Sequence, residues 1–132
     1  MKRKQRLRRS AILLSVCMAL ISGAPALAQS VDLSKAYGTT VGCQNRAGQK
    51  VESEDMLLLT DASIVTSTST CTFVQKLTAP DGTVVATALC TIEGEEGRSI
   101  AQFSIVPAKG NPANLMIYDE YGSGYDEVAP CP

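Results

Sequence analysis

The stretch of this chain richest in side chains that could do chemistry is YDEYGSGYDE, residues 118–127. It places three tyrosines and four carboxylates around a Gly-Ser-Gly centre. Tyrosine offers rigid, amphipathic contact area, and carboxylates attract basic groups across an interface. The sequence therefore predicts a binding surface for a basic protein partner, formed by Tyr118, Asp119, Glu120, Tyr121, Tyr125, Asp126 and Glu127.

Pairing within this stretch is unfavourable if it forms a hairpin. The turn can lie at Gly122–Ser123, at Ser123–Gly124 or over the whole Gly-Ser-Gly, and each register sets carboxylate opposite carboxylate. Like charges directly opposite each other destabilise a sheet. We interpret the stretch either as a charged sheet edge that discourages aggregation, or as a surface whose repulsion a partner or cation relieves.

The residue sets of common catalytic chemistry are missing. The chain has no histidine, which excludes Ser-His and Cys-His nucleophile systems. Glu93, Glu95 and Glu96 lie close together in sequence, and we interpret them as a solvated hairpin tip rather than an acid/base pair. There is no phosphate-binding loop, dinucleotide fingerprint or calcium loop. We expect a protein that is not an enzyme and that uses no cofactor and no metal.

The cysteines after residue 28 are Cys43, Cys71, Cys90 and Cys131. An even number in a short exported domain indicates two disulfides, and no Cys-x-x-Cys pair suggests zinc. Three connectivities are open. The turn at Pro80–Gly82 lies midway between the two central cysteines and sets them opposite each other, which favours 71–90 with 43–131. A glycine bulge in that turn would shift the register by one and remove this pairing.

The first 28 residues have the three parts of a secretory signal peptide. Six basic residues come first, an apolar run follows at 11–21, and Ala26-x-Ala28 ends the segment. A twin-arginine signal at Arg8-Arg9 and a lipoprotein box at Cys17 fit less well. The apolar run is too short for a stable spanning helix. We expect a periplasmic or secreted protein with no membrane span, made of residues 29–132 in one domain.

Removing that segment changes the charge balance. Six of the 12 Lys and Arg residues leave with it, and all 13 Asp and Glu residues remain, so the net charge falls from −1 to −7. A chain this acidic repels nucleic acid and anionic lipid headgroups. We therefore expect no nucleic-acid partner, and a basic protein is the partner that electrostatics favours. The oligomeric state is left open.

The elements that must position these residues are mostly strands. After a short helical turn expected at Asp32–Tyr37, runs rich in Thr, Val and Ile alternate with turn residues at the spacing of an all-β domain. The predicted strands are Thr39–Cys43, Met56–Thr60, Ser63–Ser67, Cys71–Thr78, Thr83–Ile92, Ser99–Val106, Leu115–Asp119 and Tyr125–Val128. We predict a small all-β domain: an antiparallel meander that closes into a barrel or a sandwich.

Counting across two hairpins predicts one row of the core. The turn at Pro80–Gly82 opposes Phe73 to Ala88, and a four-residue connection at Gly94–Gly97 opposes Ala88 to Phe103. The resulting row alternates large and small side chains, which fills a core without overpacking.

Several short motifs resemble a known group of proteins. AYGTTVGCQ, LLLTDASI, Cys71-Thr72-Phe73, Ala88-Leu89-Cys90 and Cys131-Pro132 together resemble small exported four-cysteine proteins of alphaproteobacteria, an uncharacterised group. This resemblance covers nearly all of residues 29–132. It implies the compartment and a β-fold rather than an activity.

A looser similarity is to periplasmic β-barrel inhibitors of proteases or lysozyme. The opening from Asp32-Leu33 to Gly38 is similar to the former, and Tyr121 to Tyr125 is similar to the Ser-Gly loop of the latter. The chain lacks the tryptophan after that opening and the fuller serine motif, so no functional residue is transferred. The similarity implies a non-catalytic binding or inhibitor-type module. The alternative is a passive structural or envelope protein whose acidic surface serves solubility.

Overall fold

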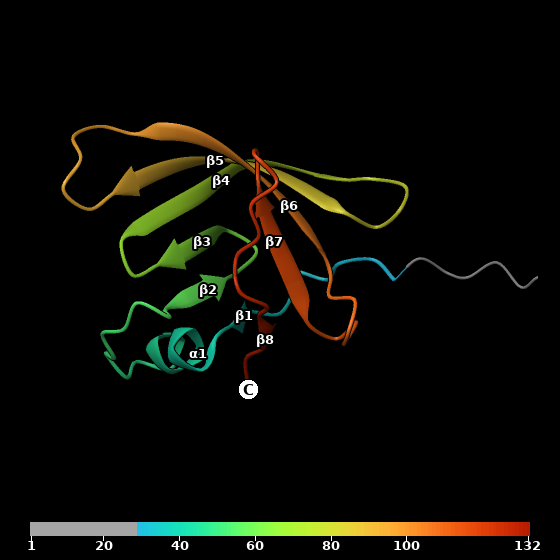
Figure 1. Cartoon of the computed structure of the whole chain (residues 1–132), viewed down its shortest axis with the longest axis horizontal. Helices are drawn as coiled ribbons and strands as arrows, with labels where there is room; N and C mark the ends of the chain where they lie inside the picture. Colours follow the sequence, from blue (N-terminus) through green and yellow to red (C-terminus); the bar gives the residue numbers. More distant parts are fainter. Residues whose placement is uncertain (1–28) are drawn as a thin grey trace, which may run out of the picture.

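Eight antiparallel strands form one sheet that curls into a nearly closed barrel (Figure 1). The structure is a computed structural model, and it describes residues 29–132. The predicted signal peptide lies outside the described residues. The predicted all-β fold is confirmed, and the choice between barrel and sandwich is resolved in favour of a barrel.

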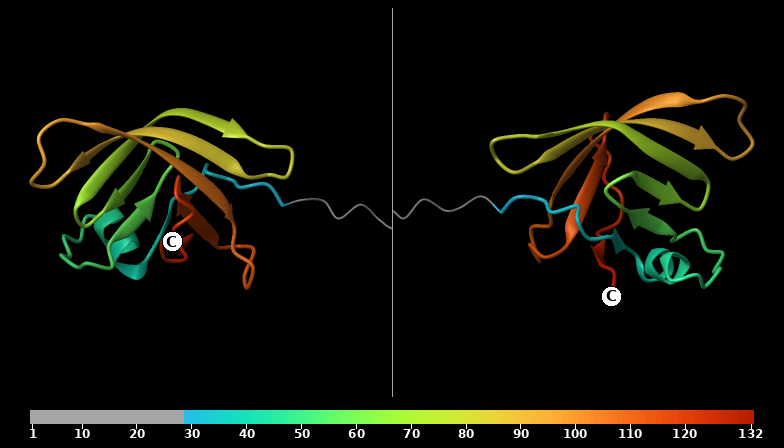
Figure 2. Two further views of the ribbon diagram at one scale, coloured as in Figure 1. Left: turned by 45° about the horizontal axis from the view of Figure 1, so that its top comes forward. Right: turned by 180° about the vertical axis from the view of Figure 1, so that it is seen from behind.

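The strands follow one another as a meander. In chain order the elements are β1 (Tyr37–Gly38), α1 (Thr40–Arg46), β2 (Leu57–Leu59), β3 (Ser63–Thr66), β4 (Ser69–Thr78), β5 (Val84–Ile92), β6 (Ser99–Pro107), β7 (Leu115–Asp119) and β8 (Ala129–Pro130). Their order in the sheet is β7-β6-β5-β4-β3-β2-β1-β8, so only β8 departs from sequence order. The β4–β5 and β5–β6 turns project beyond the barrel on opposite sides (Figure 2). Within residues 29–132, no helix has the length and apolarity needed to cross a membrane.

The segment after β7 closes the barrel. Leu115 and Val128 exchange both backbone hydrogen bonds (2.9 and 3.0 Å), and the Tyr125 N–H donates to the Ile117 carbonyl (2.8 Å). The same segment then becomes β8 and pairs with β1. The strand predicted at Tyr125–Val128 is therefore wrong, because these residues contact β7 at separate positions and β8 begins after them. The acidic stretch lies in the seam of the barrel rather than at a free sheet edge.

Alternation along the strands builds the core. Along β5 the side chains of Val84, Ala86, Ala88 and Cys90 are buried, whereas Val85 is exposed, as expected for a pleated strand with one face inward. The largest fully buried side chains are Leu59, Ile64, Ile105, Ile117 and Val128. They come from four strands and from the closing segment, which therefore contributes to the core itself.

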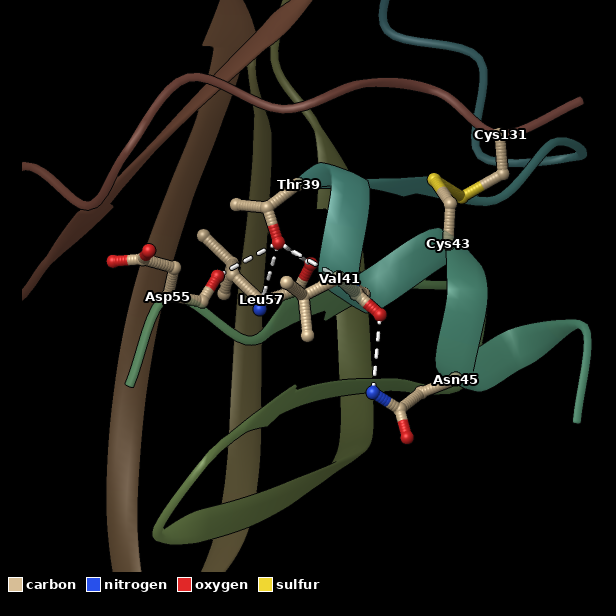
Figure 3. Close-up of a disulfide and its surroundings, with 8 residues drawn as sticks. Thr39, Val41, Cys43, Asn45, Asp55, Leu57 and Cys131 are labelled. Carbon is tan, nitrogen blue, oxygen red and sulfur yellow. Dashed lines mark hydrogen bonds between the residues drawn. A yellow bond between two sulfur atoms is a disulfide. The ribbon is translucent and has the colours of Figure 1, made fainter. Parts of the chain in front are cut away.

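The strand predicted at Thr39–Cys43 is wrong, because this segment forms helix α1. Thr39 stays extended, and its hydroxyl accepts the N–H of Gly42 (3.1 Å), which caps the helix. The same hydroxyl donates to the Asp55 carbonyl (2.7 Å), which joins the cap to the chain before β2 (Figure 3). Gly42 packs directly on β2, since a Cβ there would stand 2.0 Å from the Leu57 carbonyl oxygen. Capping and close packing override the strand preference of Thr and Val.

The helical turn predicted at Asp32–Tyr37 is also wrong. The chain makes a tight turn at Leu33–Ser34, and then β1 begins at Tyr37. The carboxylate of Asp32 accepts the Ser34 N–H (2.9 Å) within this turn. Asp32 therefore stabilises a turn and not a helix, because the side chain satisfies the local backbone before a helix can begin.

Both favoured disulfides are present, with Cα separations of 5.3 Å for Cys43–Cys131 and 3.9 Å for Cys71–Cys90. The β4–β5 turn does shift the register by one, so Leu77 lies opposite Val85 rather than Val84. An irregularity at Val74 reverses the shift, and the two cysteines are again directly opposed. The pairing was predicted correctly although the register at the hairpin tip was not.

The predicted register of the β5–β6 hairpin is wrong by two residues. Ala88 lies opposite Ala101, and Phe103 lies opposite Ala86, so the row Phe73–Ala88–Phe103 does not form. The connection spans 93–98 rather than 94–97, and Gly94 and Gly97 within it have φ values of +83° and +92°. Because the shift is even, the same side chains still face the core.

Candidate functional site

The turn after β7 is a three-residue hairpin loop. The Asp119 carbonyl accepts the Gly122 N–H (3.0 Å), and the Asp119 N–H donates to the Ser123 carbonyl (3.0 Å). Gly122 has φ +78°, a conformation that favours glycine. The turn therefore begins before the Gly-Ser-Gly centre, and all three registers considered from the sequence are wrong. In the observed register Asp119 faces Ser123, so no carboxylate opposes it.

The carboxylate of Asp119 organises this turn. Its Oδ1 accepts the N–H of Tyr121 (2.9 Å) and the N–H of Ser123 (2.8 Å). Aspartate commonly stabilises turns by this kind of local bond. Glu120 and Tyr121 are thereby held at the tip, where Tyr121 is 86% exposed.

A pocket of about 200 Å³ lies beside the turn. Its buried lining is apolar and includes Phe103 and the Cys71–Cys90 disulfide. The rings of Phe103 and half-buried Tyr125 lie 6.2 Å apart with planes tilted by 59°, within the range of favourable aromatic pairs. Glu120 and Tyr121 of the β7 turn are exposed at its rim, as are Ile92, Ser99 and Gln102 from β5 and β6, and Asp119 is half-buried.

The environment of Tyr125 reflects both its burial and the nearby charge. Burial raises the pKa of the Tyr125 phenol above its ordinary value of 10.0, and the negative charge of Asp119 raises it further. The phenol is therefore protonated at neutral pH.

The other three predicted binding residues do not line this pocket. The Tyr118 ring lies against Gly124, where a Cβ would stand 3.2 Å from the Tyr118 Cε1. Glu127 accepts a hydrogen bond from the Asn114 amide (2.6 Å), and Asp126 is exposed. The structure thus brings together four of the seven: Asp119, Glu120, Tyr121 and Tyr125.

A second group of carboxylates lies beside the β3–β4 turn and was not predicted as a site. Glu52, Glu54 and Glu93 line a pocket of about 520 Å³ that also contains Met56. From the sequence, Glu93 was grouped with Glu95 and Glu96 as a solvated tip. In the structure all three are exposed in the connection after β5, as predicted, and Glu93 also lines this pocket whereas Glu95 and Glu96 do not.

Helix α1 holds the loop that carries Glu52 and Glu54. The Asn45 amide donates to the carbonyls of Val41 (3.0 Å) and Val51 (2.8 Å), and its oxygen accepts the Val51 N–H (3.2 Å). Figure 3 shows the first of these bonds beside the Cys43–Cys131 disulfide. The loop is therefore fixed to the helix by a side chain that no catalytic or ligand motif would have singled out.

The β3–β4 turn is equally well ordered by its own side chains. The Thr66 hydroxyl accepts the N–H groups of Thr68 (3.3 Å) and Ser69 (3.0 Å) and shares a hydrogen bond with the Ser69 hydroxyl (2.8 Å). The Glu93 N–H donates to the Thr68 carbonyl (2.8 Å). Glu93 is thus held against this turn, and both line the pocket.

Within residues 29–132, no three His, Cys, Asp or Glu side chains are gathered in a way that could hold a metal ion. Comparison with known proteins finds no matching family model, no matching curated protein and no matching solved structure. The resemblance to small exported four-cysteine proteins and the similarity to periplasmic inhibitors therefore stay predictions.

Proposed function

We propose that this protein is an exported, non-catalytic binding module that captures a basic protein partner at the pocket beside the β7 turn. One observation carries the proposal: the apolar floor has Asp119, Glu120 and Tyr121 of the β7 turn along one side, and no lysine or arginine lines the pocket. A volume of about 200 Å³ is below the roughly 300–1,000 Å³ of small-molecule sites. It suits a single inserted side chain.

Lysine and arginine have the chemistry that this pocket complements. Each carries an apolar stem and a charged head. The stem would contact Phe103 and the disulfide, and the head would lie between the Glu120 carboxylate and the face of the exposed Tyr121 ring. The net charge of −7 over residues 29–132 favours encounter with a basic partner from any direction.

Other observations support the two remaining parts of the proposal, that the protein is not a catalyst and that it is exported. The chain has no histidine, and all four cysteines of the described part are in disulfides. Disulfides persist in oxidising compartments, which agrees with the signal-peptide pattern of the first 28 residues. An inhibitor-type role would follow if the captured partner were an enzyme.

Calorimetric titration against the basic proteins lysozyme, ribonuclease A and cytochrome c tests the proposal. Tyr121→Ala should weaken binding about tenfold, because exposed tyrosines at interface centres contribute strongly. Glu120→Gln should weaken it about fivefold. Glu95→Gln is the matched control, since it removes the same charge from an exposed loop outside the pocket, and should change binding less than about twofold.

Two outcomes contradict the proposal. If the wild-type protein binds none of the basic proteins, the passive envelope role is favoured. If Glu95→Gln weakens binding as much as Glu120→Gln, attraction by net charge replaces the pocket as the explanation. A lysozyme clearing assay in parallel measures whether capture also inhibits the partner.

A further inference from the structure

The first half of β6 has an open edge. On one side β6 pairs with β5 from Ser99 to Ile105, but on the other side β7 pairs only with residues 103–107. In the described part of the chain, residues 99–102 therefore have no strand beside them on the β7 side. Figure 1 shows this part of β6 in orange, at the outer border of the hairpin that projects on the left.

The backbone groups of Ile100 and Gln102 point to the open side. The carbonyl of Ile117 accepts a hydrogen bond from the segment that closes the barrel, on the side of β7 away from β6. Its neighbour Tyr118 therefore faces β6, where it lies opposite Ser104. Alternation then directs Gln102 and Ile100 to the same side as Ser104. Within residues 29–132, their N–H and C=O groups have no hydrogen-bond partner in a loop or a side chain there.

A second open edge, on β4, is protected. β3 pairs with β4 only as far as Thr72, and an irregularity at Val74 then breaks the register. Beyond it, the Lys76 ammonium donates a hydrogen bond to the Asp61 carbonyl in the β2–β3 turn. Bulges and lysines are two devices by which proteins block pairing at a free edge. Residues 99–102 have neither, since their register with β5 is regular and they are uncharged. The edge of β6 is therefore able to accept another strand.

The two faces of this edge differ in what they offer a new strand. Ala101 lies on the inner face opposite Ala88, packs against the core and lines the pocket beside the β7 turn. Ile100 lies on the outer face and is 70% exposed. Directly opposed residues of neighbouring strands direct their side chains to the same face. A strand added at this edge would therefore direct the side chain opposite Ala101 toward the pocket and the next side chain outward, beside Ile100.

We propose that the partner docks by pairing an extended segment with β6 at Ser99–Gln102, with one lysine or arginine of that segment in the pocket. The inference rests on the proposed function and adds to it the way in which the partner is recognised. Bonds to the backbone of Ile100 and Gln102 hold any extended chain, and the pocket selects the side chain opposite Ala101. An apolar neighbour of that side chain would cover Ile100.

Charge decides between the two strands that fit this edge, one from a basic partner and one from a second copy of this protein. Two copies would bring together two domains that each carry a net charge of −7 over residues 29–132. A basic side chain instead meets Asp119 and Glu120, which line the pocket, whereas Arg98 precedes the edge and lies outside the pocket. The basic partner is therefore the favoured occupant.

Fluorescence anisotropy with the labelled peptide Ser-Thr-Ile-Arg-Ile-Thr-Ser tests this inference. With the arginine opposite Ala101, the two isoleucines lie opposite Ile100 and Gln102, and their N–H groups face β6. N-methylation of both isoleucines removes these donors without changing a side chain or a charge, and should weaken binding at least about tenfold. N-methylation of both threonines is the matched control, because their N–H groups face away, and should change binding less than about threefold.

A variant of the protein tests the same edge from the other side. Ile100→Lys removes the exposed apolar side chain and adds a positive charge, and should weaken binding of the unmodified peptide about fivefold. Leu77→Lys is the matched control, since Leu77 is also exposed (60% against 70%) but lies on β4. It should change binding less than about twofold. Thermal unfolding verifies that both variants are folded.

Three results overturn the proposal. They are no binding of the unmodified peptide, equal weakening by the two N-methylated peptides, and equal weakening by the two lysine variants. Sedimentation equilibrium without peptide supplies a fourth: a dimer that Ile100→Lys dissociates would place a second copy at this edge, whereas a monomer supports the proposal. Each of these failures leaves the proposed function standing if Glu120→Gln weakens lysozyme binding, so the two claims are judged separately.

Discussion

The regions around the two disulfides are held together in different ways. Cys43–Cys131 joins α1 to the end of the chain, where β1 and β8 have two residues each and pair at two positions. Cys71–Cys90 joins β4 and β5, which are already paired at nine positions. The first bond secures a closure that short backbone pairing cannot secure alone. The second joins two strands that their backbone pairing already holds together. Its two buried cysteines form part of the candidate binding pocket.

Removing each disulfide in turn tests this difference between the two regions and should produce the largest effects on stability. Cys43→Ala/Cys131→Ala releases a loop with sequence separation 88 and should lower the free energy of unfolding by about 4–5 kcal/mol. Cys71→Ala/Cys90→Ala opens a loop with sequence separation 19 and should lower the free energy of unfolding by about 3 kcal/mol. Denaturant unfolding measures both, and a larger loss for the second pair would contradict the comparison.

Close packing at α1 should produce the next largest effect. Alanine normally stabilises a helix relative to glycine by about 1 kcal/mol. At Gly42 the added Cβ would stand 2.0 Å from the Leu57 carbonyl, so Gly42→Ala should instead destabilise the fold by about 3 kcal/mol. Gly110→Ala is the control, because its Cβ would meet nothing within 4 Å. Unfolding curves that place both variants near wild type would show that α1 is not held against β2.

At the pocket, the turn should depend on one carboxylate. Asp119→Ala removes the acceptor of two backbone N–H groups and should cost about 1–2 kcal/mol, whereas Asp119→Asn keeps an oxygen there and should cost less. Asp126→Ala removes an exposed carboxylate of the same stretch and serves as the control. Thermal and denaturant unfolding measure the series. Equal costs for the alanine variants at 119 and 126 would contradict the role of Asp119 in the turn.

The smallest effect concerns the titration of Tyr125. An ultraviolet difference titration of wild type against Tyr125→Phe should give a pKa above 10.0 for this phenol. Asp119→Asn should lower that pKa only in part, because burial is the larger cause. Since the folded pKa is raised, the stability that Tyr125 contributes is complete below pH 10.0 and is lost as the pH rises through the folded value. A pKa at or below 10.0 would place Tyr125 in solvent.

Much of the fold was predictable because alternation and turn residues act locally. The strands from β2 to β7 lie within two residues of their predicted limits. Helix α1 was not predictable from its Thr-Val start, because the hydroxyl of Thr39 bonds the carbonyl of Asp55 across a loop. The register around the β4–β5 turn depends on an irregularity at Val74 that no turn residue marks.

The candidate site was predictable where one stretch of chain supplies it. Asp119, Glu120, Tyr121 and Tyr125 meet because a single hairpin carries them. Glu54 and Glu93 come from distant parts of the sequence, and only the pairing of β3, β4 and β5 brings them to one pocket. Their proximity is visible only in the structure and has no signal in residue spacing.

Nuclear magnetic resonance titration with lysozyme tests the central claim, capture of a basic protein beside the β7 turn, most directly. We predict amide shift changes around the pocket beside the β7 turn, at Cys71, Cys90, Phe103 and Glu120–Tyr121. Residues around the Cys43–Cys131 disulfide and at the Pro80–Gly82 turn should keep their shifts. Changes confined to those two regions, or spread evenly over the acidic surface, would contradict a binding pocket beside the β7 turn.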